Sequence, residues 1–249
     1  MKRIYLDKND CFIEGEKIKI RRDSFHYLKN VLRMTKNNKF IGFDGTGKEY
    51  EIIIEKVRDD FLLGKILHGK INFSSEPDFE LILCQSIPKG RKMDFIISEV
   101  TQLGVKKIIP IISERVILKL DKEEKNNKIK RWNKIAEEAS KISGRNTIPY
   151  IENFTNFKDA LNYETDFSLI FWEGEKKLLK EVIRNIEVGK DNFKIKIFIG
   201  PEGGYTEKEI NLAEKNGIIS VSLGKRILKV ETAAVIATGI IFYELENID

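Results

Sequence analysis

Five short apolar segments alternate with five helical segments between residues 79 and 246, and this alternation limits the possible folds. Each apolar segment has six to eight residues, which is typical of a buried strand. Strands that alternate with helices predict a parallel sheet covered by helices on both faces. The expected strands are 79–85, 105–112, 167–172, 193–199 and 218–223, and the expected helices are 91–103, 122–142, 176–186, 206–216 and 232–246.

The first 72 residues have a different pattern, in which short strand-like runs are separated by turns. Runs at 17–20, 40–43, 49–55 and 61–67 are rich in alternating or β-branched residues. One apolar helical pattern lies within 23–34. Several short strands with a single helix predict a small β-barrel. The polar run at residues 72–78 resembles a linker, so we expect domains at 1–72 and 73–249.

The positive charge of the chain is confined to the first of these domains. Lysine and arginine exceed the acids by five over the whole chain, with 16 against 11 in residues 1–72 and 28 against 28 afterwards. This asymmetry favours a module that binds a polyanion, attached to a neutral one. The alternative is the codon bias of an AT-rich genome, because lysine, asparagine and isoleucine are all frequent.

Several classes of protein are excluded by composition. Cys11 and Cys84 form neither a disulfide framework nor a CxxC pair, and no secretory h-region follows Met1. The longest apolar run, at 233–243, is shorter than the ~18 residues of a membrane span. Neither histidine, His26 nor His68, belongs to a metal-ligand cluster. We expect a cytoplasmic protein with no membrane partner and no metal.

Three unusual loops follow predicted strands, at 172–175, 200–205 and 223–234. In open parallel sheets, ligands bind outside the carboxyl ends of the strands. The second loop has three glycines, which permit close approach of a ligand to the backbone. It has no P-loop signature and carries Glu202, so a neutral or cationic ligand suits it better than a phosphate. The alternative is an ordinary tight turn between a strand and a helix.

The third loop places two apolar residues, Ile227 and Leu228, among lysine and arginine residues. Its backbone could bind the edge of an adenine while Leu223 and Leu228 enclose the ring. Glu231 could either face a cation or stabilise the N-terminus of the next helix through the helix dipole.

These two loops carry motifs of a known family. The run Gly200-Pro201-Glu202-Gly203-Gly204, followed by Leu223-Gly224-x-Arg226-Ile227-Leu228-x-x-Glu231-Thr232-Ala233, resembles the RsmE family of 16S rRNA (uracil-N3)-methyltransferases, in the SPOUT superfamily. Weaker motifs of the family occur in the expected order at 26–33, 89–94, 103–105, 113–115 and 131–149.

The resemblance implies an α/β fold with an N-terminal PUA-like β-barrel and a C-terminal SPOUT-type domain that contains a trefoil knot. It also implies a homodimer, S-adenosylmethionine (SAM) bound in the knot at about 195–240, and 16S rRNA or the small ribosomal subunit as the partner. The cofactor residues that it implies are Trp172, Ile199, Gly200, Pro201, Glu202, Gly203, Gly204, Leu223, Gly224, Ile227, Leu228, Thr232 and Ala233.

The acceptor uridine must lose its N3 proton, so charge develops on O2 and O4. Arg226 and Arg145 are candidates to stabilise this charge, and Glu231 is a candidate base or orienting group. The candidate RNA contacts are Arg21, Arg22, His26, Lys29, Arg33, Lys89 and Lys92.

The chain departs from the family pattern at Lys229, where arginine is common, and at Glu99, Gln102 and Ile142. Two other functions stay open. One is a non-catalytic RNA-binding or assembly factor on the same fold, and the other is a SPOUT methyltransferase for a different nucleotide or a ribose.

Overall fold

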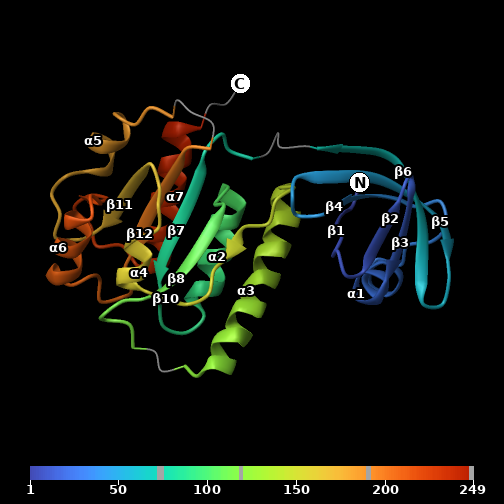
Figure 1. Cartoon of the computed structure of the whole chain (residues 1–249), viewed down its shortest axis with the longest axis horizontal. Helices are drawn as coiled ribbons and strands as arrows, with labels where there is room; N and C mark the ends of the chain where they lie inside the picture. The colour runs from blue at the N-terminus through green and yellow to red at the C-terminus, as the bar shows by residue number, and fades with distance from the viewer. Residues whose placement is uncertain (72–75, 118–119, 189–191, 247–249) are drawn as a thin grey trace. The chain divides into compact units, whose positions relative to one another are not determined.

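A computed structural model describes residues 1–71, 76–117, 120–188 and 192–246 (Figure 1). The chain divides into two compact units, which we call unit 1 and unit 2. Unit 1 contains Met1–Glu76 and Ser140–Ile148, and unit 2 contains Pro77–Ala139 and Pro149–Asp249. The predicted domain boundary after residue 72 lies outside the described residues.

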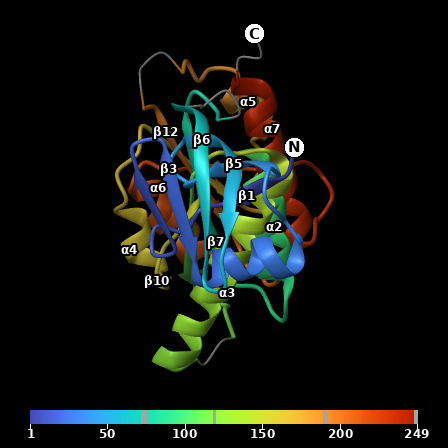
Figure 2. The same ribbon diagram turned by 90° about the vertical axis from the view of Figure 1, so that its right-hand side faces the viewer.

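Unit 1 is built on a six-stranded sheet with the order β1-β4-β5-β6-β3-β2 (Figure 2). Neighbouring strands are antiparallel except for the parallel pair β1 and β4. The strands are β1 (Arg3–Tyr5), β2 (Cys11–Glu14), β3 (Lys17–Arg21), β4 (Lys39–Phe43), β5 (Lys48–Val57) and β6 (Phe61–Ile71).

The predicted helix at 23–34 is interrupted. The α-helix α1 covers only Arg22–His26, and a π-helical turn, η1 (Tyr27–Val31), continues it. Phe25 and Leu28 are buried against the isoleucines of the sheet, whereas Val31 is 65% exposed. The wider π turn changes the angle between successive side chains, so Val31 leaves the expected apolar face, whereas Leu32 still packs against the core.

The segment Ser140–Ile148 adds to unit 1 beside the turn between β4 and β5. The Gly47 N–H donates to the carbonyl of Asn146 at 3.1 Å, and the Ile148 N–H donates to that of Gly45 at 3.3 Å. Unit 1 is therefore assembled from two parts of the chain that are far apart in sequence.

Unit 2 contains a seven-stranded sheet in which all neighbouring strands are parallel, with the order β10-β8-β7-β12-β11-β13 and β9 beside β8. Its strands are β7 (Glu80–Ser86), β8 (Lys107–Ile112), β9 (Tyr150–Ile151), β10 (Thr155–Asn156), β11 (Phe167–Phe171), β12 (Lys194–Ile199) and β13 (Ile219–Val221). Its helices are α2 (Lys92–Leu103), α4 (Phe157–Leu161), α5 (Leu179–Ile183), α6 (Glu207–Lys215) and α7 (Val230–Leu245), and α3 (Lys122–Ser143) begins in this unit.

The five predicted strands of unit 2 are confirmed, and the differences lie in short elements. Strands β9 and β10 have two residues each, too few to show an alternating pattern. Helix α5 is shorter than predicted because the chain turns before it. Glu175 accepts hydrogen bonds from the N–H groups of Lys176 and Lys177, at 2.7 and 3.0 Å. These hydrogen bonds lower the pKa of Glu175, and the one from Lys177 is the largest cause.

Helices cover both faces of this sheet. Residues of α4 and α6 form one buried cluster with Ile82, Cys84 and Phe198. Successive strand residues point to opposite faces, so Leu81 and Leu83 face the other layer, where α2 and α7 pack together. Among the described helices, none is both long and apolar enough to cross a membrane.

A buried lysine joins the sheet to α4. Lys196 on β12 is 1% exposed, and its Nζ donates to the carbonyls of Leu161 and Tyr163 at 2.9 and 2.7 Å. Burial lowers the pKa of this ammonium group. These bonds satisfy carbonyls at the C-terminal end of α4 that would otherwise lack partners.

Candidate functional site

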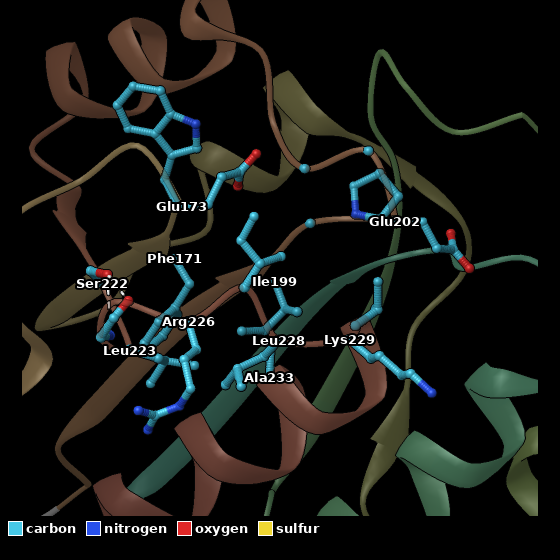
Figure 3. Close-up of a pocket in the computed structure, with 18 of the residues that line it drawn as sticks. Phe171, Glu173, Ile199, Glu202, Ser222, Leu223, Arg226, Leu228, Lys229 and Ala233 are labelled. Carbon is cyan, nitrogen blue, oxygen red and sulfur yellow. Dashed lines mark hydrogen bonds between the residues drawn. The ribbon is translucent and has the colours of Figure 1, made fainter.

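A cavity of about 480 Å³ lies at the carboxyl ends of β11, β12 and β13 in unit 2 (Figure 3). This is the edge of a parallel sheet at which ligands bind. The loop after each of the three strands contributes to the wall. The lining residues are Lys92, Phe171, Trp172, Glu173, Ile199, Gly200, Pro201, Glu202, Gly203, Gly204, Ser222, Leu223, Gly224, Lys225, Arg226, Ile227, Leu228, Lys229, Val230 and Ala233.

The loop after β12 requires glycine at two positions. Gly204 has a φ of +66°, and its N–H closes a turn on the carbonyl of Pro201 at 2.9 Å. A Cβ at Gly200 would come within 3.2 Å of the Gly204 backbone. The loop therefore presents backbone directly to the cavity. Helix α6 begins with a capping box, in which Thr206 and Glu209 exchange hydrogen bonds.

Arg115, in the loop after β8, fixes the glycine loop from outside the cavity. Its Nη1 donates to the carbonyl of Gly203, and a Cβ at Gly203 would lie 3.2 Å from its Cδ. The neighbouring Glu114 accepts from the Thr206 hydroxyl at 3.1 Å and donates its N–H to Glu209 at 2.9 Å. The sequence pattern predicts no role at the site for Glu114 and Arg115, and the only signal that includes them is the family motif at 113–115.

The loop after β13 forms the apolar side of the cavity. Gly224 has a φ of +119°, and its backbone exchanges two 3.2 Å hydrogen bonds with the Ser222 hydroxyl. Figure 3 shows Leu228 and Ile199 close together in the middle of the cavity. Ile227 is 87% exposed at the rim. This loop thus combines an apolar surface with backbone N–H and C=O groups that are not used in pairing between strands.

Glu202 contacts the first residue of α2 and the segment that precedes this helix. Its Oε1 lies 2.7 Å from the Nζ of Lys92 and accepts the Lys89 N–H at 3.0 Å. Burial raises the pKa of Glu202, but the hydrogen bonds from Lys92 and the backbone outweigh it, so the pKa is lowered overall. The hydrogen bond to Glu202 in turn raises the pKa of Lys92. Much of the charge of Glu202 is therefore already compensated.

Glu173 is the other carboxylate of the cavity, and it has no hydrogen-bond or ion-pair partner among the described residues. It comes from the loop after β11 and lies against Gly204, where a Cβ would collide with the carboxylate. The two carboxylates thus differ, because Glu202 is paired and Glu173 is available to a ligand.

Twelve of the thirteen predicted cofactor residues line this one cavity. The exception is Thr232, which is exposed on α7. Arg226 and Lys92 also line it. Glu231 does not line it; its side chain is half-buried, and its Oε2 has no hydrogen-bond partner in the part of the chain that the structure describes. The lining residues that the predicted set omitted are Phe171, Glu173, Ser222, Lys225, Lys229 and Val230.

Arg145 lies in unit 1 and is 2% exposed. Its Nη2 is 2.7 Å from Oε2 of Glu76 and donates to the Thr147 hydroxyl at 3.1 Å. Thr147 also donates its hydroxyl to Glu76, at 2.6 Å. The structure therefore places this predicted catalytic residue in a buried ion pair and not among the residues that line the cavity.

The predicted RNA contacts are distributed over both units. Arg21, Arg22 and His26 are exposed at and beside α1, and the His26 ring lies 3.2 Å from the Asn30 amide. Lys29 and Arg33 belong to η1 and the loop after it. Lys89 is exposed in unit 2, near the N-terminus of α2.

The described residues contain no group of three or more His, Cys, Asp or Glu side chains placed to hold a metal ion. Cys84 is fully buried in β7, and burial raises its pKa to about 12, so the thiol stays protonated at neutral pH. The cavity therefore offers carboxylate, cationic and backbone groups as its polar chemistry.

Comparisons with known proteins agree with this site. Residues 75–242 match the model of an RNA methyltransferase domain, and residues 20–67 match that of an RNA methyltransferase PUA domain. The chain is 30% identical to ribosomal RNA small subunit methyltransferase E of Bacillus subtilis, over 99% of this chain and 98% of the relative.

Two solved structures match this chain over almost its whole length and over almost the whole length of their own chains. One is a ribosomal RNA small subunit methyltransferase E from Neisseria gonorrhoeae bound to SAM, with 30% identity, a TM-score of 0.84 and 98% coverage of each chain. The other, from Legionella pneumophila, is also in complex with SAM, with 27% identity, a TM-score of 0.87 and coverage of 99% of this chain and 98% of that one. Sequence, fold and site agree, and the chain belongs to the ribosomal RNA small subunit methyltransferase E family.

Proposed function

We propose that this chain transfers the methyl group of SAM to N3 of a uridine in 16S rRNA. The observation that carries the proposal is the cavity at the ends of β11, β12 and β13, which collects twelve of the thirteen residues expected to hold the cofactor. The SAM that is bound in two similar structures supports this choice of ligand.

The residues of the cavity fit this cofactor. Leu223 and Leu228 offer apolar surface for an adenine ring, and the loop backbone at 225–228, beyond Gly224, offers hydrogen-bonding groups for its edge. The glycine loop admits close approach of the rest of the molecule. When bound, SAM supplies an electrophilic methyl group on a positively charged sulfur. The protein then has to hold the acceptor in line with that methyl group and exclude water.

Glu173 is the carboxylate that we assign to the positive charge of the cofactor. Glu202, the residue favoured from the sequence, is held by Lys92 and by the Lys89 N–H. A carboxylate that already has a cationic partner attracts a second cation less strongly, because the two fields partly cancel. Glu173 has no such partner among the described residues, and it lies at the glycine loop.

Arg226 is our candidate for stabilising the acceptor. It lines the cavity, is exposed, and has no hydrogen-bond or ion-pair partner within the described ranges. A guanidinium group near O2 or O4 of uridine would favour the charge that develops as N3 loses its proton. Glu231 is the candidate base or orienting group, with an Oε2 that has no partner among the described residues.

Three further features belong to the proposal. The chain segment at about 195–240 forms the knot that holds the cofactor. The protein acts in the cytoplasm. It forms a homodimer through unit 2, in which Phe95, Ile236 and Tyr243 on α2 and α7 are 53%, 43% and 82% exposed. Light scattering after size exclusion tests the dimer, and a monomer at micromolar concentration would contradict it.

Two measurements test the function. Calorimetry with SAM separates an enzyme from a non-catalytic assembly factor, which would bind none. Mass spectrometry of 16S rRNA from cells that lack the protein then identifies the modified position. We expect the loss of one N3-methyluridine that the purified protein restores, whereas loss of a different modified nucleotide would show that the acceptor is wrong.

A further inference from the structure

Arg115 does not line the cavity, yet its side chain reaches the glycine loop at 200–205, which forms part of the cavity wall. We propose that Arg115 is a positioning residue for SAM. It holds the backbone at Gly203 in the shape that receives the cofactor, so its loss lowers the affinity for SAM although no group in the cavity is removed. This inference rests on the proposed function, because it takes SAM as the ligand of the cavity.

The side chain of Arg115 explains why residue 203 is a glycine. The φ of Gly203 is not positive, unlike that of Gly204, so the backbone conformation alone would accept an alanine. A Cβ at Gly203 would lie 3.2 Å from the Cδ and 3.5 Å from the Cβ of Arg115. The shorter distance is tighter than an ordinary van der Waals contact, so the arginine stem would have to shift. The packing of Arg115, and not the turn, therefore favours glycine at this position.

The guanidinium group of Arg115 fixes one peptide unit of the loop. Its Nη1 donates to the Gly203 carbonyl, so this carbonyl is directed at a residue outside the set that lines the cavity. The N–H of the same peptide, on Gly204, donates to the Pro201 carbonyl at 2.9 Å. The peptide between Gly203 and Gly204 therefore cannot rotate without breaking two hydrogen bonds.

The residue that precedes Arg115 is anchored at the far end of the glycine loop. The Glu114 N–H donates to Glu209 at 2.9 Å, and the Glu114 carboxylate accepts from the Thr206 hydroxyl at 3.1 Å. Thr206 is the N-cap of α6 and follows the glycine loop directly. Arg115 thus approaches Gly203 from a backbone that is itself fixed, as a supporting residue of a binding site must be.

Ordering of the loop before binding is the physical reason for an effect on affinity. Glycine loses more conformational freedom on ordering than any other residue, and a ligand binds more weakly when it has to order its own site. Without Arg115, SAM itself would have to order the two adjacent glycines. Once SAM is bound, the loop is ordered in either case, so the loss falls in the KM for SAM more than in kcat.

Two other roles of an exposed arginine would give different kinetics. In the described part of the chain the side chain of Arg115 has no acidic partner, and its hydrogen bond goes to a neutral carbonyl. An arginine that bound an RNA phosphate would affect the KM for RNA, and one that took part in methyl transfer would affect kcat. The three roles are therefore separable by measurement.

The test uses the full chain and four variants, which are Arg115→Ala, Arg115→Lys, Gly203→Ala and the double variant of Arg115→Ala with Gly203→Ala. Arg184→Ala is the matched control, because Arg184 is an exposed arginine at the C-terminal end of α5 and does not line the cavity. Calorimetry gives the affinity for SAM, and steady-state methylation of 16S rRNA gives kcat and both KM values. Thermal unfolding reports the stability of each variant.

We expect Arg115→Ala to weaken SAM binding about tenfold, the scale of one hydrogen bond from a charged donor. Arg115→Lys should recover part of this loss, because it keeps a cationic donor but not the planar fork. Gly203→Ala should also weaken binding, because its methyl group displaces the arginine stem. In the double variant the methyl group has no arginine to displace, so SAM should bind about as it does to Arg115→Ala. The control should bind SAM like the wild type.

Fully additive losses in the double variant would overturn the proposal. So would an unchanged SAM affinity in Arg115→Ala, whether thermal stability, kcat or the KM for RNA changes in its place. The wild-type protein separates this inference from the proposed function. If it binds no SAM, both fail together. If it binds SAM and Arg115→Ala binds SAM equally well, the role of Arg115 alone is refuted.

Discussion

The buried pair of Arg145 and Glu76 gives the sharpest prediction. Replacing Arg145 by alanine leaves Glu76, whose side chain is only 9% exposed, without its cation. Removal of one partner of a buried ion pair costs about 3–5 kcal/mol. The total stability of a domain is about 5–15 kcal/mol, so the change removes a large part of it. The exposed pair Lys39–Glu51 is the matched control, and Lys39→Ala should cost less than about 1 kcal/mol.

The measurement must report on unit 1 alone, because a chain with two units need not unfold in a single step. Hydrogen exchange followed by mass spectrometry meets this need for peptides that cover β3 and β6. We expect Arg145→Ala to accelerate exchange there by about two to three orders of magnitude. The combination of Glu76→Ala with Arg145→Ala should recover part of the loss, because no buried charge is then left alone.

The opposite pattern would refute this reasoning. If Arg145→Ala exchanges like the wild type in unit 1 but loses methyl transfer with intact SAM binding, then Arg145 acts in the chemistry, as the sequence analysis predicted. If neither hydrogen exchange in unit 1 nor methyl transfer changes, Arg145 has neither the structural role nor the catalytic role.

Three other predictions concern the cavity. Arg226→Ala should lower kcat by at least tenfold, while the affinity for SAM measured by calorimetry stays unchanged. If kcat and SAM affinity fall equally, Arg226 holds the cofactor instead. Glu173→Gln should weaken SAM binding about fivefold, or ~1 kcal/mol. Glu202→Gln should weaken it less, because Lys92 already compensates that carboxylate. A larger loss of SAM affinity in Glu202→Gln than in Glu173→Gln would contradict the assignment. The pKa of Glu202 is lowered from its ordinary 4.5, so its stabilising contribution is complete above pH 4.5 and is lost as the pH falls through the lowered pKa. Thermal unfolding of Glu202→Gln should therefore approach that of the wild type in acid, and a constant difference across this range would show that the pKa is not perturbed.

The sequence predicted unit 2 well because its strands are continuous apolar runs that end in unusual loops. All three loops around the cavity were found in this way, and so were Gly200, Gly204 and Leu228. Two-residue strands such as β9 and β10 could not be found, because their pairing depends on β8 and not on their own pattern.

The ion-pair partners of the site residues were harder to predict than the loops in which those residues lie. Both Glu173 and Glu202 lie in loops that the sequence analysis selected, yet only the fold shows that Lys92, 110 residues away in sequence, is bound to Glu202. Arg145 shows the same difficulty, since its partner Glu76 is 69 residues distant. In unit 1, the π turn and the bulge of β5 at Glu55 leave no compositional trace, so neither could be predicted from the sequence.

The assembly of unit 1 from two stretches of chain has a consequence for how the protein is made. Synthesis proceeds from the N-terminus, and domains generally fold as units. The first 76 residues emerge from the ribosome long before Ser140–Ile148, which contribute Arg145 and Thr147 to the unit. Glu76 then lacks its partners until a further 71 residues have been added, so the nascent barrel is incomplete over that interval. A fragment that ends near residue 76 would keep this defect permanently, whereas joining residues 140–148 to it by a short linker should restore the missing ion pair.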